Sequence, residues 1–229
     1  MKNIVVFDIE ALTFSFKADK GCLLCVGYKY LNEGKAMVLR RTQFDDPFND
    51  KKLCEQIYPI LANAEGWITH NGKHFDVPFL NTRFLLNGLQ PLPHTTRHFD
   101  TCDVMYHKLK MGNSLKNAIE QFKIPTEKTP LDLRGSLKAA LGDKKEMDYI
   151  VDHCKRDIVA TESLYTTLAP LGAPGWSMKT LVDRPEVCPS CGKSGEIHRR
   201  GWNKLVTRKS PRFQCQACGH WFSGKIEKI

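Results

Sequence analysis

The stretch Val5-Val6-Phe7-Asp8-Ile9-Glu10 decides the fold of this chain. A short apolar run with carboxylates at alternate positions near its end predicts a buried strand that directs Asp8 and Glu10 from one face. Two anions side by side on a largely buried surface repel each other and are poorly solvated, so they need a cation between them. A divalent metal ion would meet that need. The alternative is that both carboxylates lie at the end of the strand and are solvated.

The length and composition indicate a globular protein. The 229 residues suffice for one domain of ordinary size plus a small module, or for two small domains, and the hydrophobic fraction of 41% can form a core. We expect neither a membrane span nor a signal peptide, because no long apolar run and no basic segment followed by an apolar one occurs. A cytoplasmic location is therefore predicted. The nine cysteines, odd in number and partly clustered, indicate reduced thiols and metal binding rather than disulfides.

The positive charge is concentrated at the C-terminal end. The net charge is +9, and residues 184–229 hold ten of the 34 basic residues but only three of the 25 acidic ones. A basic segment beside a nearly neutral remainder indicates contact with a polyanion, most simply nucleic acid. A solvated basic surface is the alternative that charge alone leaves open.

Hydrophobic periodicity predicts alternating strands and helices over residues 1–168. Beyond the first strand, we expect strands at 22–28, 36–40, 66–70 and 97–101, and helices at 50–64, 78–85, 102–109, 114–122 and 144–167. The segment 125–141 is expected to be irregular or partly helical. Cys22 and Cys25 have the spacing of a metal knuckle but no turn residue between them, so we expect them in the core. Proline and glycine residues predict a linker over 169–185.

Four more polar residues occupy informative positions. Asp76 lies just before a helix that begins near Pro78, and Asp100 ends a predicted strand; an aspartate at either place is more typically a helix cap. His153 and Asp157 lie one turn apart on the last predicted helix, at the edge of its apolar stripe. Each of these residues alone is typical of a helix surface, and their shared face makes the pair a candidate site.

These residues resemble, in their order, the three motifs of the DEDD exonucleases. The matching stretches are Val6-Phe7-Asp8-Ile9-Glu10, His70-Asn71-Gly72-Lys73-His74-Phe75-Asp76 and His153-Cys154-Lys155-Arg156-Asp157. A histidine before the last aspartate is the feature of the DEDDh branch, which this chain resembles. Three residues separate His153 from Asp157, however, and that spacing is the one usual in the tyrosine branch. The resemblance covers residues 1–168 and extends to the YprB-like bacterial and phage members. It implies an α/β domain of ribonuclease H-like fold, with a mixed central sheet flanked by helices.

The resemblance also implies a reaction. A DEDDh protein is a 3′-to-5′ exonuclease that hydrolyses phosphodiester bonds of DNA or RNA with two Mg²⁺ or Mn²⁺ ions. Asp8 would bridge the two ions, Glu10 and Asp157 would complete the coordination of the first ion, and Asp76 would hold the second ion. His153 would remove the proton from the attacking water. The alternatives are a nucleic-acid-binding or adaptor protein that uses the nuclease fold as a platform, and a structure-selective endonuclease.

Two cysteine knuckles predict a small zinc-ribbon β module over residues 186–229. They are Cys188-Pro189-Ser190-Cys191-Gly192 and Cys215-Gln216-Ala217-Cys218-Gly219. Each has two residues between its thiols and a glycine after them, which is typical of one structural Zn²⁺ bound by four cysteines. His198 or His220 in place of one thiolate is the alternative. A module this small needs the metal in order to fold.

Basic and aromatic residues alternate in this module, as in the zinc ribbons attached to transposases, which it resembles. The candidates for contacts with nucleic acid are Arg199, Arg200, Lys204, Arg208, Lys209 and Arg212. We expect Trp202, Phe213 and Trp221 to form the core of the module instead of stacking on bases. The ribbon would then hold nucleic acid or recruit a protein partner.

Overall fold

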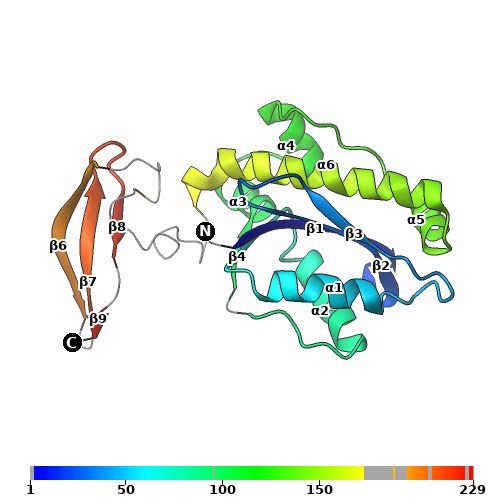
Figure 1. Ribbon diagram of the computed structural model, residues 1–229. Coiled ribbons are helices and arrows are strands. Elements are labelled where there is room, and N and C mark those ends of the chain that lie inside the picture. Colours follow the sequence, from blue (N-terminus) through cyan, green and yellow to red (C-terminus); the bar gives the residue numbers. More distant parts are fainter. Residues whose placement is uncertain are drawn as a thin grey trace. The chain divides into compact units, whose positions relative to one another are not determined.

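The computed structural model describes residues 3–94, 96–172, 188, 195–205, 208–224 and 227–228. The chain divides into two compact units, Met1–Leu168 and Ala169–Ile229 (Figure 1). Of the predicted linker over 169–185, only the start is described, and it begins with a 3₁₀ turn, Ala169–Leu171. Residues 173–185 lie outside the described part of the chain.

The first unit is built on a five-stranded mixed sheet with the strand order β3-β2-β1-β4-β5. The strands are β1 (Ile4–Phe14), β2 (Lys17–Tyr30), β3 (Met37–Arg40), β4 (Gly66–Thr69) and β5 (Arg97–Asp100). Strands β1, β2 and β3 pair antiparallel, whereas β4 runs parallel to both β1 and β5. This sheet confirms the predicted fold class. The first strand lies at its centre, which explains why Val5, Val6 and Phe7 are fully buried.

In the described part of the first unit, helices flank the sheet on both faces. They are α1 (Lys51–Ala62), α2 (Asp76–Leu86), α3 (Thr101–Lys108), α4 (Leu115–Phe122), α5 (Leu133–Ala140) and α6 (Lys144–Leu168). Helices α1 and α2 cover one face, and α6 crosses the other (Figure 1). The second half of the segment 125–141 is helix α5, in keeping with the expectation of partly helical structure. Within the described parts of the chain, no helix combines the length and the apolar character that a membrane span needs.

The sheet separates two apolar cores. Val5, Phe7 and Ile9 pack with α1 and α2 on one face. On the other face, Cys22 and Cys25 pack with residues of α5 and α6, so the expectation that these two cysteines belong to the core is confirmed. Burial also raises the pKa of the Cys22 thiol to about 11, which keeps it protonated.

A buried ion pair ties α1 to α2. Nε and Nη2 of Arg83 each donate to a carboxylate oxygen of Asp50 at 2.8 Å. The same carboxylate accepts from the backbone N–H of Leu23 and from Nδ2 of Asn87, both at 2.8 Å. Asp50 is 1% exposed and Arg83 is 7% exposed. Asp50 stands at the N-cap of α1 yet makes no capping hydrogen bond there, because its oxygens are committed to this pair.

Helix α6 comes close to the sheet at Gly27 of β2. A Cβ atom at this position would lie 2.7 Å from Sγ of Cys154 and 3.1 Å from Cγ1 of Ile158. The absence of a side chain therefore sets the distance between α6 and the sheet. The Cys154 thiol also donates to the carbonyl oxygen of Asp8 at 3.7 Å. Cys154 therefore connects α6 to the backbone of β1 at the first predicted acid.

The second unit is a small antiparallel sheet. Its strands are β6 (Ile197–Leu205), β7 (Arg208–Cys215), β8 (Trp221–Ser223) and β9 (Glu227–Lys228), with β7 pairing to the other three (Figure 1). Phe222 is buried, and its ring stacks on that of Phe213 at 5.5 Å. The expectation of a core position was wrong for Trp202 and Trp221, which are 37% and 42% exposed. So small a sheet encloses few side chains, and its register turns both indoles outward.

Candidate functional site

The predicted acids of β1 face helix α6. Because side chains alternate along a strand, Phe7 and Ile9 enter the core beneath α1 and α2, and Asp8 and Glu10 emerge on the opposite face. His153 and Asp157 project from α6 toward them, and each is 3% exposed. Residues more than 140 positions apart in the sequence are thus brought to one place.

Three of the predicted residues form a compact group. Nε2 of His153 lies 3.4 Å from Oε1 of Glu10 and 3.4 Å from Oδ2 of Asp157. The nearest ligand atoms of these side chains all lie within 4.8 Å of one another, close enough for them to share one metal ion. The structure therefore joins the first and third sequence motifs in a single site.

Asp76 reaches the same strand from the start of α2. Its Oδ1 accepts a hydrogen bond of 3.0 Å from the backbone N–H of Ile9, the residue between the two acids of β1. Asp76 is the first residue of α2, whose N-cap residue is Phe75, and no side-chain capping bond is present. A helix cap, the alternative to a metal ligand for Asp76, therefore does not account for its position, because its carboxylate is turned toward the sheet.

Asp100, in contrast, is the helix cap that the sequence predicted. Its carboxylate accepts from the backbone N–H groups of Cys102 and Asp103 at the start of α3, at 3.0 and 3.4 Å. It also accepts from the N–H groups of Asn71 and Lys73, at 2.8 and 2.9 Å, and so fixes the loop that precedes α2. With these bonds, the carboxylate of Asp100 has a structural role.

The clustered acids strongly perturb one another. Burial, and then the charges of neighbouring acids, raise the pKa of Asp8 and of Glu10 well above their usual values. Burial raises the pKa of Asp76 to about 7, against the effect of the hydrogen bond from Ile9. For Asp157, burial acts in the same direction, but His153 and Lys128 outweigh it, and its pKa is lowered. Among the described residues, Oδ2 of Asp8 and Oδ1 of Asp157 are buried without a hydrogen-bond partner, which is the environment that a bound cation would complete.

Lys128 is a member of this site that sequence reasoning missed. Its ammonium group pairs with Oδ2 of Asp157 and lies 3.3 Å from Nε2 of His153. Burial lowers its pKa, but the charges of Asp157, Asp8 and Glu10 outweigh this effect and raise it, so the group is a cation. Lys128 stands in the loop between α4 and α5, where hydrophobic periodicity carries no signal. No pattern in the sequence distinguishes it from a solvated surface lysine.

The contacts of His153 with Lys128 and Thr129 favour one tautomer of its ring. An ammonium group can only donate, so Nε2 of His153 accepts from Lys128. The ring proton then sits on Nδ1 and is donated to Oγ1 of Thr129 at 2.7 Å. In this assignment Nε2 carries the lone pair of the ring, and Lys128 occupies it in this structure.

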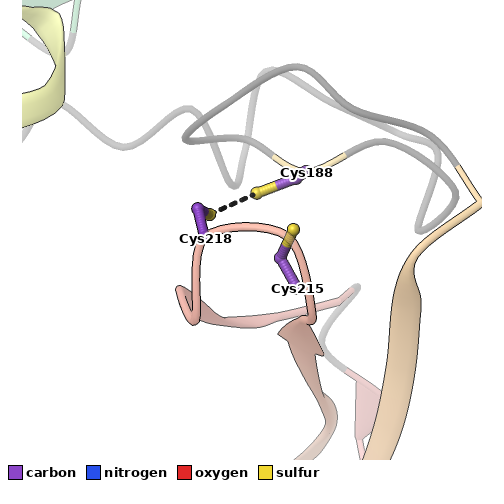
Figure 2. Close-up of side chains that lie close together, drawn as sticks. All are labelled: Cys188, Cys215 and Cys218. Atoms are coloured by element: carbon purple, nitrogen blue, oxygen red, sulfur yellow. Dashed lines mark hydrogen bonds between the residues drawn. The ribbon is translucent and has the colours of Figure 1, made fainter.

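In the second unit, three predicted zinc ligands lie together (Figure 2). Sγ of Cys188 and Sγ of Cys218 are 3.6 Å apart, and Sγ of Cys215 completes a group within 4.8 Å. Tetrahedral zinc with Zn–S bonds of about 2.3 Å would hold its sulfurs about 3.8 Å apart, so this spacing fits the metal. Cys191 lies outside the described residues. His198 and His220 are both described, and neither belongs to this group.

The environment of Cys215 favours a thiolate. Burial raises its pKa, but hydrogen bonds from the backbone N–H groups of Cys218 and Ala217, together with one from the Cys188 thiol, lower it to about 7. A thiol must be deprotonated to bind zinc. The local backbone of the second knuckle is thus suited to a metal ligand at this position.

The basic residues of the second unit lie mainly on its surface. Arg199, Arg200, Lys204 and Arg212 are exposed, and Lys209 is partly buried. The side chain of Arg208 lies outside the described part of the structure. These positions leave the predicted cations accessible to a polyanion.

The mixed sheet, with acids from β1 and α6 meeting over its centre, defines an α/β protein of ribonuclease H-like architecture. Residues 5–169 match the model of the RNase_H superfamily, and the chain belongs to this superfamily. No curated protein sequence matches the chain.

Solved structures are similar to this chain at low sequence identity. The family B DNA polymerase from the archaeon Pyrobaculum calidifontis is 15% identical with a TM-score of 0.56, over 73% of this chain and 24% of the polymerase. Escherichia coli exonuclease I in complex with a dA16 oligonucleotide is 16% identical with a TM-score of 0.46, over 73% of this chain and 41% of its own. The zinc-bound form of its complex with single-stranded DNA is 14% identical with a TM-score of 0.47, over 91% and 54% of the two chains. This chain thus spans about a quarter of the polymerase and about half of the exonuclease.

Proposed function

We propose that this chain is a metal-dependent 3′-to-5′ exonuclease that hydrolyses phosphodiester bonds of DNA or RNA. The observation that carries the proposal is the meeting of Glu10, His153 and Asp157 within 4.8 Å, beside the buried and unpartnered oxygen of Asp8. Membership of the RNase_H superfamily supports a nuclease. The 3′-to-5′ direction is supported by the order of the motifs, which resembles that of the DEDDh exonucleases.

The donor set fits hard divalent cations. Asp8, Glu10, Asp76 and Asp157 offer carboxylate oxygens, the ligands that Mg²⁺ and Mn²⁺ prefer, and they would hold two such ions. Bound there, the ions would supply an activated water and offset the charge that develops on the leaving oxygen. The raised pKa values of Asp8 and Glu10 support this assignment, because these acids need added positive charge in order to ionise.

The remaining side chains would handle the proton and the charge. Nε2 of His153 would accept the proton of the attacking water once the Lys128 ammonium group has moved aside, and Thr129 would hold the ring in the required tautomer. Lys128 offsets part of the acidic charge beside Asp157, which would ease the approach of an anionic phosphate. In this assignment, Thr129 orients the ring of His153, and Lys128 offsets the negative charge of Asp157.

We also propose that the second unit is a zinc ribbon that helps to hold the substrate. Cys188, Cys215 and Cys218 would bind one structural Zn²⁺ together with Cys191. The phosphate contacts would come from Arg199, Arg200, Lys204, Arg208, Lys209 and Arg212. The fit of the described sulfur atoms to tetrahedral zinc, and the exposure of most of these cations, support this role.

Product analysis on labelled oligonucleotides tests the proposed activity. Single-stranded DNA and RNA of one sequence, labelled at the 5′ end, should be shortened step by step in the presence of Mg²⁺ or Mn²⁺, with release of nucleoside 5′-monophosphates. A matched strand with a blocked 3′ end should resist. Internal cuts would instead show an endonuclease. Intact strands that remain bound would show an adaptor.

Replacement of His153 by alanine should slow hydrolysis about 100-fold or more, because the attacking water loses its proton acceptor. Binding of Mn²⁺, measured by calorimetry, should be largely retained, and added imidazole should restore part of the rate. Thr129→Val is the matched control, since it removes the hydrogen bond to Nδ1 and a longer one from Arg156 but keeps the imidazole, and it should cause a smaller loss. A wild-type rate for the His153 variant would remove the histidine from the mechanism.

Replacement of Cys188 by serine should unfold the second unit without stopping the chemistry. The wild-type chain should contain one zinc ion, measured by elemental analysis, and the variant should lose it because a thiolate ligand is missing. Affinity for long strands should fall, while hydrolysis of a short oligonucleotide should continue. Cys102→Ser, in α3 of the first unit, is the control and should retain zinc. Full zinc content in the Cys188 variant would contradict the ribbon.

A further inference from the structure

An exposed tryptophan and two cations form a distinct surface on the β6–β7 hairpin. The guanidinium of Arg199 lies 4.5 Å from the ring centroid of Trp202, and Nζ of Lys209 lies 5.0 Å from it. The indole is nevertheless 37% exposed. Large aromatic side chains are usually enclosed, so an indole held outward between cations suggests a binding role.

The strand register shows which residues share this surface. Trp202 pairs with Pro211, and Lys204 pairs with Lys209. Residues that face each other across antiparallel strands project from the same side of the sheet. Positions 209 and 211 are two apart in β7, so their side chains also project from one side. Arg199 belongs to the same side, since its guanidinium contacts the indole. We name this side, with Arg199, Trp202, Lys204 and Lys209, the Trp202 face.

The opposite side of the sheet carries a second exposed tryptophan. Trp221 pairs with Gln214, whose position in β7 alternates with that of Arg212. The Arg212 guanidinium lies 4.7 Å from the Trp221 ring centroid, which confirms that the two side chains share a side. The two tryptophans therefore have similar exposure and similar cation contacts but project in opposite directions. The structure thus supplies a matched control for any property of the Trp202 face.

The Trp202 face has the charge of a surface that meets an anion. It carries three cations. Neither β6 nor β7 contains an acidic residue, and Glu227 of β9 is the position that pairs with Lys209. A segment of an acidic protein would complement the charges of Arg199 and Lys204 but offers no partner for an exposed aromatic ring. A nucleic acid offers both phosphates and flat bases. Bases in a duplex are already stacked on their neighbours, so the complementary ligand is a single strand.

We infer that the Trp202 face binds single-stranded nucleic acid by stacking an unpaired base on Trp202, with Arg199, Lys204 and Lys209 at the adjacent phosphates. Arg199 and Lys209 lie over the indole in the unbound chain, so a stacked base would take the place of one of them, and the displaced cation would contact an adjacent phosphate. Every base has a π-face, so the site would tolerate different sequences. This inference deepens the proposed function and rests on it for the class of ligand.

Binding measurements on the full chain test the inference. An Asp8→Asn background, expected to be inactive, keeps the strand intact with zinc in place, and fluorescence anisotropy follows a labelled dT12 strand, an rU12 strand and a 12-bp duplex. Trp202→Ala should weaken single-strand binding about tenfold, and Trp202→Phe should retain most of it. Trp221→Ala, on the opposite side, should change it less than about twofold. Zinc content and circular dichroism of each variant establish that the ribbon is folded.

Several results would overturn the inference. These are an unchanged affinity in Trp202→Ala, an equal loss in Trp221→Ala, or equally Trp202-dependent binding of the duplex. Capture of a polyglutamate peptide of similar length, with the same affinity and the same dependence on Trp202, would indicate a protein partner instead. Hydrolysis by the wild-type chain is assayed separately. Its absence would refute the proposed function without affecting the binding result, whereas normal hydrolysis with Trp202-independent binding would refute this inference alone.

Discussion

Replacement of Asp8 by asparagine should abolish hydrolysis and should also stabilise the protein when divalent cations are withheld from the acidic site. Loss of residues that only support a metal ligand commonly costs 10- to 100-fold, so loss of a bridging ligand should cost more than about a hundredfold. The gain in stability follows from the buried oxygen of Asp8 that lacks a partner among the described residues. A neutral amide of the same shape removes the repulsion from Asp76 and Asp157.

The pH dependence of stability provides a second readout of the same site. In the folded protein the pKa of Asp76 is raised from 3.8 to about 7, so between these values the folded state holds a proton that the unfolded chain has released. The free energy of unfolding should therefore fall as the pH rises through this window, and Asp76→Asn should flatten the decline. Added Mg²⁺ or Mn²⁺ should restore more stability at pH 8 than at pH 5. Thermal unfolding at both pH values, without chelators so that zinc is retained, measures these effects. An Asp8→Asn variant that is active, or less stable than wild type without added cations, would contradict the acidic metal site.

Replacement of Arg83 by alanine should destabilise the first unit by about 3 to 5 kcal/mol, because it leaves the buried carboxylate of Asp50 without its countercharge. The fluorescence of Trp67, which is buried in the core beneath α1 and α2, reports this unfolding in urea. Arg40→Ala is the control. Arg40 pairs with Asp148 at a site where both side chains are about half exposed, so its loss should cost less than about 1 kcal/mol. Equal losses of unfolding free energy in the two variants would show that the buried pair stabilises the protein no more than the exposed pair does.

The parts of the fold that follow from periodicity could be predicted from the sequence. The alternation in Val5–Glu10 predicted a buried strand and predicted that Asp8 and Glu10 emerge from one face of it. The helical spacing of His153 and Asp157 predicted that they share a face. The sequence also predicted that Asp100 is a cap, because its position relative to α3 is local information.

Interactions between segments far apart in the sequence could not be predicted in this way. Lys128 lies in an irregular loop, and its partner Asp157 is 29 positions away, so neither periodicity nor local spacing connects them. The pairing of Asp50 with Arg83 spans 33 positions and depends on how two helices pack. The exposure of Trp202 was missed for a related reason, since the register of a small sheet decides which aromatic ring is enclosed.

The contact between Gly27 and Cys154 has a consequence for heritable variation in this protein. The close approach of the Gly27 backbone to the sulfur atom of Cys154 fixes how α6 lies on the sheet. It thereby keeps Asp8 and Glu10 of β1 aligned with Asp157 of α6. A methyl group added at Gly27 would act as a spacer that lifts the helix and carries Asp157 away from Asp8, although no charged group has been altered. We therefore expect inactivating or temperature-sensitive alleles to arise at this glycine, in a position that a survey of ionisable residues alone would overlook.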